Sequence, residues 1–77
     1  MSEVEWIKIF GDNLKEMLEE EKITQMDLSK KTGLSIVTIN RYINKQQMPT
    51  IKAVLSISYA LNCNVSDLID FGDSIEM

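Results

Sequence analysis

The fold of this chain is decided by residues 23–43, which read ITQMDLSKKTGLSIVTINRYI. Thr24 is a residue type that caps helix N-termini, and Asp27 follows at the position from which a carboxylate bonds back to the cap. Leu28 supplies an inward-facing side chain, and Gly33 interrupts the pattern. The sequence therefore predicts a helix of about two turns between Thr24 and Gly33.

A second short helix is predicted directly after this one. Ser35 is its cap, and the helix extends to about Lys45. Leu34, Ile39 and Tyr42 are spaced so that they pack inward. Two short helices joined by a turn that contains glycine match the helix-turn-helix arrangement in length and spacing.

Residues before this pair predict another helix. Ser2 and Glu5 form a capping box for a helix from about Glu3 to Glu21, although Gly11 also allows a start near that residue. Its apolar residues recur at helical spacing, and they are Trp6, Phe10, Leu14, Met17 and Leu18.

Residues 48–69 predict two further helices. Thr50 follows Met48-Pro49 as the cap of one, and Asn62 stands where a left-handed residue would close it. An apolar stripe is expected on this helix, formed by Ile51, Val54, Leu55, Ile57, Ala60 and Leu61. Asn64 with Asp67 is a capping pair for a short last helix. No stretch has the pattern of a strand.

The chain length of 77 residues allows one domain. We therefore expect an all-α, five-helix domain over residues 1–70, followed by an acidic tail at residues 71–77. The chain has no histidine, and Cys63 is its one cysteine, so neither a zinc site of Cys and His ligands nor a Cys/His nucleophile pair can form. We expect no enzyme activity, no metal, no cofactor and no small-molecule substrate.

The composition also predicts where in the cell the protein is located. One cysteine cannot form an internal disulfide, which indicates a reducing, cytoplasmic location. No apolar run approaches the roughly 20 residues that span a bilayer, so we expect no membrane contact. Cys63 itself is expected to be a buried small apolar residue without a redox role.

Charge is distributed unevenly along the sequence. The whole chain carries a net charge of -4, which by itself disfavours binding to phosphate. Residues 22–66, however, hold six basic residues and one acid, whereas residues 1–21 have a net charge of -5 and the last eleven residues -4. A basic middle between acidic ends is typical of a protein with one DNA-facing side.

The residues around the two short helices resemble the Cro and CI repressor type, also called the XRE family. The resemblance rests on Ile23 to Ser29, Gly33 to Ser35, Thr38 to Tyr42 and Pro49-Thr50, and it extends over about residues 10–69. It implies a lambda-repressor-like fold of five helices, the third of which lies in the major groove of double-stranded DNA. It also implies transcription regulation by a small bacterial or phage repressor or controller, with a homodimer on a palindromic operator.

The same resemblance assigns site residues position by position. Base edges are approached by Ser35, Ile36, Val37, Asn40 and Arg41, and backbone phosphates by Gln25, Thr38, Asn44 and Lys45. Arg41 can bond guanine in bidentate fashion and Asn40 can bond adenine, whereas Ile36 and Val37 can only contact the thymine methyl group. We therefore expect a site rich in A·T opposite Ile36 and Val37.

Two departures from the family pattern also lead to expectations. The loop after the recognition helix lacks the usual glycine, so Asn44 is expected to end the helix in a left-handed conformation. The few cations predict modest affinity for DNA with a shallow salt dependence. Leu18 and Ile43 stand where many relatives carry an arginine and a glutamate. Because replacing both members of a buried ion pair by apolar residues is often neutral or stabilising, we expect Leu18 to touch Ile43.

Apolar residues beyond the needs of a minimal core indicate a further surface. They are Trp6, Ile7, Ile9, Phe71 and Ile75, which either cap the core or form a twofold dimer interface. The main alternative function is a protein-interaction module on the same fold, either antitoxin-like or an antagonist. It would use the acidic surface together with the apolar patch of Ile36 and Val37.

Overall fold

This computed structural model describes residues 2–69 of the chain, which contain five α-helices joined by loops. They are α1 (Glu3–Glu21), α2 (Gln25–Thr32), α3 (Ile36–Ile43), α4 (Ile51–Ala60) and α5 (Val65–Leu68). Residues 2–69 contain no strand, so the predicted all-α, five-helix fold is confirmed. The expected tail at residues 71–77, with Phe71 and Ile75, lies outside the described residues.

The helices begin where the sequence predicts. Four hydroxyl caps accept a backbone N–H three residues later, in the pairs Ser2–Glu5 (3.2 Å), Thr24–Asp27 (3.0 Å), Ser35–Thr38 (3.1 Å) and Thr50–Ala53 (3.0 Å). At the start of α5, the Asn64 N–H donates to the Asp67 carboxylate at 3.1 Å. Helix α1 continues through Gly11, so its start is at Glu3 and not near the glycine. These caps satisfy N–H groups that have no partner within the helix.

The helix C-termini depart from the usual preference for glycine. Helix α2 ends at Gly33 with φ of 79°, whereas α1, α3 and α4 are followed by non-glycine residues with positive φ: Lys22 (56°), Lys45 (62°) and Asn62 (52°). Asn62 confirms the prediction for α4. The prediction of a left-handed Asn44 is wrong, because Asn44 has φ of -86° and the next residue makes the left-handed turn. Helix α3 accordingly ends at Ile43, two residues before the expected end.

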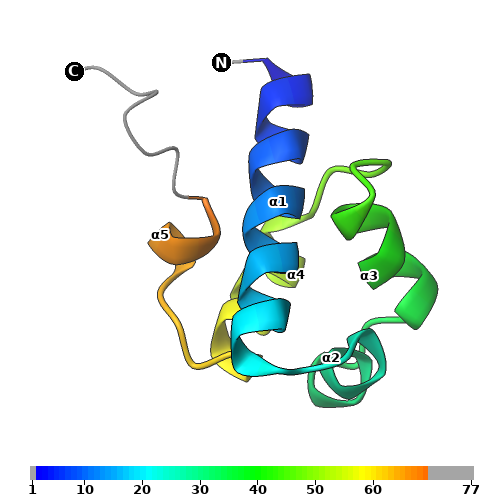
Figure 1. The fold of residues 1–77 in the computed structure, drawn as a ribbon. Coiled ribbons are helices and arrows are strands. Elements are labelled where there is room, and N and C mark those ends of the chain that lie inside the picture. Colours follow the sequence, from blue (N-terminus) through cyan, green and yellow to red (C-terminus); the bar gives the residue numbers. More distant parts are fainter. Residues whose placement is uncertain (1, 70–77) are drawn as a thin grey trace.

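The hydrophobic core lies where α1 crosses the other helices. Helix α1 has α3 on one side and α5 on the other, and α4 closes the core from behind in the view of Figure 1. The fully buried large side chains are Phe10, Leu14, Leu28, Ile39, Ile57 and Leu68. Phe10 and Tyr42 meet edge to face with ring centroids 5.7 Å apart, and Trp6 stands 5.9 Å from Phe10. The edge contact between Phe10 and Tyr42 adds to the stabilisation by burial and fixes α3 on α1.

Helix α4 differs from its prediction in the face that it buries. Ile51 and Leu55 belong to the predicted apolar stripe but are 80% and 53% exposed, whereas Ala53 and Ser58, which lie outside that stripe, are buried. The Ser58 hydroxyl donates to the Leu55 carbonyl at 2.9 Å, so its burial leaves no polar group without a partner. Helix α4 therefore presents two large apolar side chains to solvent.

Candidate nucleic-acid interface

The turn between α2 and α3 is fixed by side-chain hydrogen bonds. The Ser29 hydroxyl donates to the Leu34 carbonyl at 2.6 Å, and the Leu34 N–H donates to the Thr32 hydroxyl at 3.1 Å. The Thr32 hydroxyl in turn donates to the Leu28 carbonyl at 2.8 Å. Because these bonds satisfy the backbone of the turn, α3 is held at a defined angle to α2.

Helix α3 presents its outer face to solvent. Ile39 and Tyr42 are buried as predicted, while Ile36 is 41% and Val37 is 55% exposed. Asn40 and Arg41 are exposed on the same side. A hollow of about 360 Å³ lies there, lined by Gln25, Ile36, Val37, Asn40, Arg41 and Gln46. The structure thus brings four of the five candidate base-contacting residues together with Gln25 of α2.

Three side-chain amides form a hydrogen-bonded chain beside this hollow. The Asn40 amide donates to the Gln25 oxygen at 3.4 Å, and the Asn40 oxygen accepts from the Asn44 amide at 2.9 Å. Asn40 therefore links the start of α2 to the end of α3. Such a chain orients all three amides in advance, which reduces the entropy lost when they contact a ligand.

The side chains of Ser35 and Thr38 are hydrogen-bonded to each other. The Ser35 hydroxyl accepts the Thr38 N–H and donates to the Thr38 hydroxyl at 2.9 Å. Ser35 is exposed and Thr38 is half-buried. Both side chains therefore stabilise the first turn of α3 at the edge of the candidate interface.

The loop after α3 brings in two residues that the sequence analysis did not single out. Gln46 returns beside Arg41, because its N–H donates to the Arg41 carbonyl at 2.8 Å. Asp12 of α1 pairs with Lys45, with Nζ 2.7 Å from Oδ1. Both placements depend on the left-handed backbone of Lys45, a conformation that lysine seldom adopts and that its residue type did not indicate.

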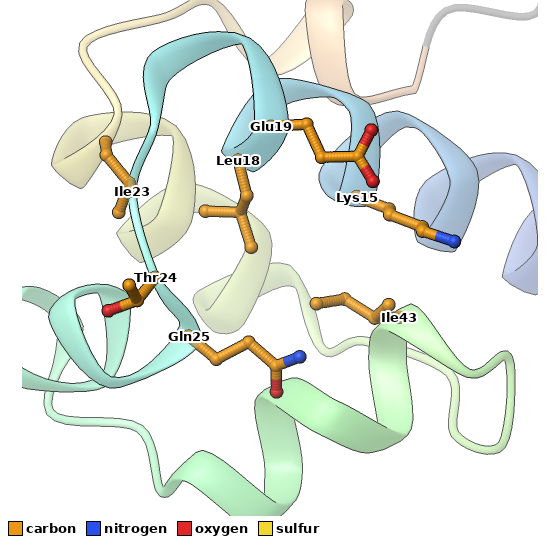
Figure 2. A pocket seen from close by; sticks show the side chains of 7 residues that line it. All are labelled: Lys15, Leu18, Glu19, Ile23, Thr24, Gln25 and Ile43. Carbon is orange, nitrogen blue, oxygen red and sulfur yellow. The ribbon is translucent and has the colours of Figure 1, made fainter.

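A second pocket, of about 290 Å³, lies between the C-terminal half of α1 and the helix-turn-helix pair. Figure 2 shows Leu18 and Ile43 pointing into it from opposite sides, with Gln25 below. Its lining is completed by Lys15, Glu19, Ile23 and Thr24. The two residues at the family's ion-pair positions thus face the same space, and their direct contact stays a prediction.

The first turn of α2, which carries Gln25, is capped by the carboxylate of Asp27. The Thr24 backbone N–H and then the Thr24 hydroxyl hold the pKa of the Asp27 carboxyl below its usual value, and Lys30 and Lys31 contribute in the same direction. Asp27 is thereby committed to the cap of α2. The N–H groups of the first turn and the positive end of the helix dipole are the features that bind phosphate in proteins.

A third hollow, of about 340 Å³, lies on the α5 side of α1 and is almost wholly apolar. We call it the α4–α5 groove, and it is lined by Trp6, Met48, Pro49, Ile51, Val54, Leu55, Val65 and Ile69. Trp6 is half-buried here, as are Ile7 and Ile9 elsewhere on α1. The groove continues into the exposed side chains of Ile51 and Leu55.

Other kinds of site find little support in residues 2–69. No group of three or more His, Cys, Asp or Glu side chains within that range is placed to hold a metal ion. No helix in the same range combines the length and the apolar character needed to cross a membrane. Cys63 is half-buried 3.9 Å from the Met17 sulfur, and burial, followed by the charge of Asp67, raises the pKa of its thiol. That direction is opposite to the one that activates a cysteine.

Comparisons with known proteins agree with this geometry. The family model of the Cro/C1-type HTH DNA-binding domain matches residues 13–74. Among solved structures, an HTH_3 family transcriptional regulator from Vibrio cholerae has the same fold, with a TM-score of 0.84 at 18% identity. The match covers 87% of this chain and 38% of that protein, so the present chain spans well under half of it. Comparison with curated proteins gives no match. Because the family model spans most of the residues that build the five helices, the protein belongs to the Cro/C1-type family of helix-turn-helix DNA-binding domains.

Proposed function

We propose that this protein reads the major groove of double-stranded DNA with α3 and regulates transcription as a small repressor or controller. The observation that carries the proposal is the hollow on the outer face of α3, where polar and apolar side chains converge beside the start of α2. Arg41 bonds guanine and Asn40 bonds adenine. Ile36 and Val37 contact thymine methyl groups, and Ser35 lies at the rim where the helix enters the groove.

Phosphate contacts flank these base contacts. Gln25 and the first N–H groups of α2 bind one phosphate, and Thr38, Asn44 and Lys45 lie along the path of the backbone. The amide chain of Gln25, Asn40 and Asn44 supports this arrangement, because it couples a phosphate-binding residue to a base-reading one. The small number of cations supports modest affinity with shallow salt dependence.

A titration with fluorescent duplex DNA tests the function. Wild-type protein is expected to bind a random duplex near about 50 mM salt, and selection from random DNA is expected to return a preferred sequence. Gln25→Ala weakens binding to every duplex, because it removes a phosphate contact, and it also reduces the preference for adenine, because Asn40 loses the side-chain oxygen to which it donates. Arg41→Ala loses both affinity and preference at the contacted guanine by about 1–3 kcal/mol.

Arg41→Lys is the matched control for charge. It keeps the cation but lacks the planar fork of donors, so it retains affinity for random duplex while its guanine preference falls. If wild-type protein binds no duplex at that salt concentration, the DNA-binding function is contradicted.

The α4–α5 groove supports a homodimer on a palindromic operator. Its apolar lining and the exposed Ile51 and Leu55 form a continuous surface of the kind that monomeric proteins rarely leave in water. Because α1 separates α5 from α3, a second copy seated on this groove leaves both recognition helices open. A twofold dimer with the two helices about 34 Å apart contacts successive major grooves on one side of the duplex.

A protein-interaction module remains the second candidate function. It is favoured by the exposed apolar side chains of Met26, Ile36 and Val37 on the outer side of α2 and α3, which suit a protein partner as well as a thymine methyl group. This second function would be favoured if the protein binds no DNA but binds a partner protein, and if Ile36→Ser and Val37→Ser abolish binding of that partner. We place either function in the cytoplasm of a bacterial or phage-infected cell.

A further inference from the structure

Lys45, the one cation in the loop between α3 and α4, is held against α1. Its Nζ lies 2.7 Å from Oδ1 of Asp12, and the two side chains are 42% and 49% exposed. This loop directly follows the recognition helix, where a cation is well placed to meet DNA phosphate. The pairing therefore bears on the number of charges available to the duplex.

The backbone of the loop fixes the direction of the Lys45 side chain. The Lys45 N–H donates to the Tyr42 carbonyl at 3.1 Å, and the Gln46 N–H donates to the Arg41 carbonyl at 2.8 Å. These two bonds are those of a Schellman turn, in which the residue at position 45 must be left-handed, and its φ is 62°. The side chain of Lys45 therefore leaves the backbone toward α1, and the ion pair with Asp12 holds its far end there.

Gly11 gives the stem its space on α1. A Cβ placed on Gly11 would lie 3.1 Å from Cγ of Lys45, which shows how closely the lysine crosses the helix. Lys45 crosses α1 at Gly11, the one residue of that helix without a side chain, and the next residue, Asp12, supplies the carboxylate that pairs with the ammonium group. Gly11 and Asp12 together thus form a seat for Lys45.

We propose that Asp12 limits DNA affinity by keeping Lys45 neutralised. The inference rests on the proposed DNA-binding function. A phosphate that approaches Lys45 meets a carboxylate already in contact with the ammonium group, so repulsion opposes the contact. The pair as a whole has no net charge and therefore adds nothing to the counterion release that drives binding. Exposed ion pairs contribute little to folding, so the effect of Asp12 falls on DNA binding and not on stability.

Asp12→Asn tests this proposal by fluorescence anisotropy on a random duplex. With Lys45 released to a phosphate, binding at about 100 mM salt becomes about five- to tenfold tighter, and the slope of log K against log salt becomes steeper by about 0.9. Lys45→Gln removes the gain: the double variant, which like the wild-type pair has no net charge at this site, binds like wild type, whereas Lys45→Gln alone leaves Asp12 unpaired and binds more weakly. Equal thermal unfolding curves show that the fold is unchanged.

Glu16→Gln is the matched control. It removes the same charge from α1, but Glu16 lines a hollow with Asn13, Met17, Glu20 and Asp67 on the side of α1 that faces α5. We expect a small change in affinity and an unchanged salt slope. The proposal is overturned if Asp12→Asn binds no more tightly than wild type, or if Glu16→Gln gives an equal gain. Wild-type protein that binds no duplex at all contradicts the proposed function itself, which separates the two failures.

Discussion

Gly11 of α1 lies directly against the backbone carbonyl of Tyr42 at the end of α3. A Cβ at position 11 would be 2.5 Å from that oxygen and 3.3 Å from the Ile43 carbonyl, and neither backbone atom can rotate away. The glycine therefore sets how closely the recognition helix approaches α1.

Gly11→Ala is expected to lower the free energy of unfolding by about 1–3 kcal/mol, because the overlap forces α1 and α3 apart. The helix propensity of alanine acts in the opposite direction by about 1 kcal/mol, so a stabilised variant would contradict the contact. Urea unfolding measures the difference. Gly33→Asn is the control, because nothing lies within 4 Å of a Cβ there and asparagine tolerates a positive φ.

Replacing thymine by deoxyuridine in a selected site tests the contacts of Ile36 and Val37. Loss of each contacted methyl group is expected to weaken wild-type binding by about 0.8 kcal/mol. The double variant Ile36→Ala and Val37→Ala, measured on the same duplexes, should no longer distinguish the two bases. Substitution at thymines outside the selected positions is the control. Equal discrimination by wild type and variant would argue that these side chains do not touch the bases.

Ile51→Glu and Leu55→Glu are expected to prevent the proposed dimer, because each places a charge in the apolar α4–α5 groove. Sedimentation or light scattering measures the mass in solution. Tyr59→Glu on the same helix is the matched control, because Tyr59 is 91% exposed and does not line the groove. A wild-type protein that is monomeric at high concentration, or a control that dissociates equally, would exclude this interface.

Acid unfolding should show the contribution of the α2 cap. The Thr24 backbone N–H is the largest cause of the lowered pKa of Asp27, followed by the Thr24 hydroxyl. A carboxyl whose pKa is lower in the folded state stabilises the fold above its unfolded value of about 3.9, and this contribution is lost as the pH falls through the folded pKa. The difference in Tm between wild type and Asp27→Asn should therefore shrink below about pH 4. A difference independent of pH would contradict the assignment.

Local rules account for most of the agreement between sequence and structure. Ser2, Thr24, Ser35 and Thr50 cap their helices as expected, because a hydroxyl and the N–H three residues later are near each other whatever the rest of the fold does. Buried Leu28, Ile39 and Tyr42 also follow from helical spacing. The family resemblance then identified which face of α3 is free, and exposed Ile36, Val37, Asn40 and Arg41 agree with it.

The differences arise where tertiary contacts decide between equal local choices. Helix α4 is apolar on nearly every side, so spacing did not show that Ala53 would face the core while Leu55 faced solvent. Asp12 and Lys45 are 33 positions apart in sequence, and their ion pair depends on a left-handed residue that composition does not indicate. Asn44 was the better candidate for that conformation by residue type. The hydrogen bonds of the Schellman turn instead require the left-handed conformation one position later, at Lys45.

Left-handed Lys45 also has an evolutionary meaning. A side chain in this conformation costs about 1 kcal/mol relative to glycine, so a mutation to glycine would make the protein harder to unfold. The same mutation would delete a positive charge next to the recognition helix and leave Asp12 unopposed. Variants selected for heat resistance alone should therefore drift toward glycine at this position, whereas selection on gene control should retain the lysine.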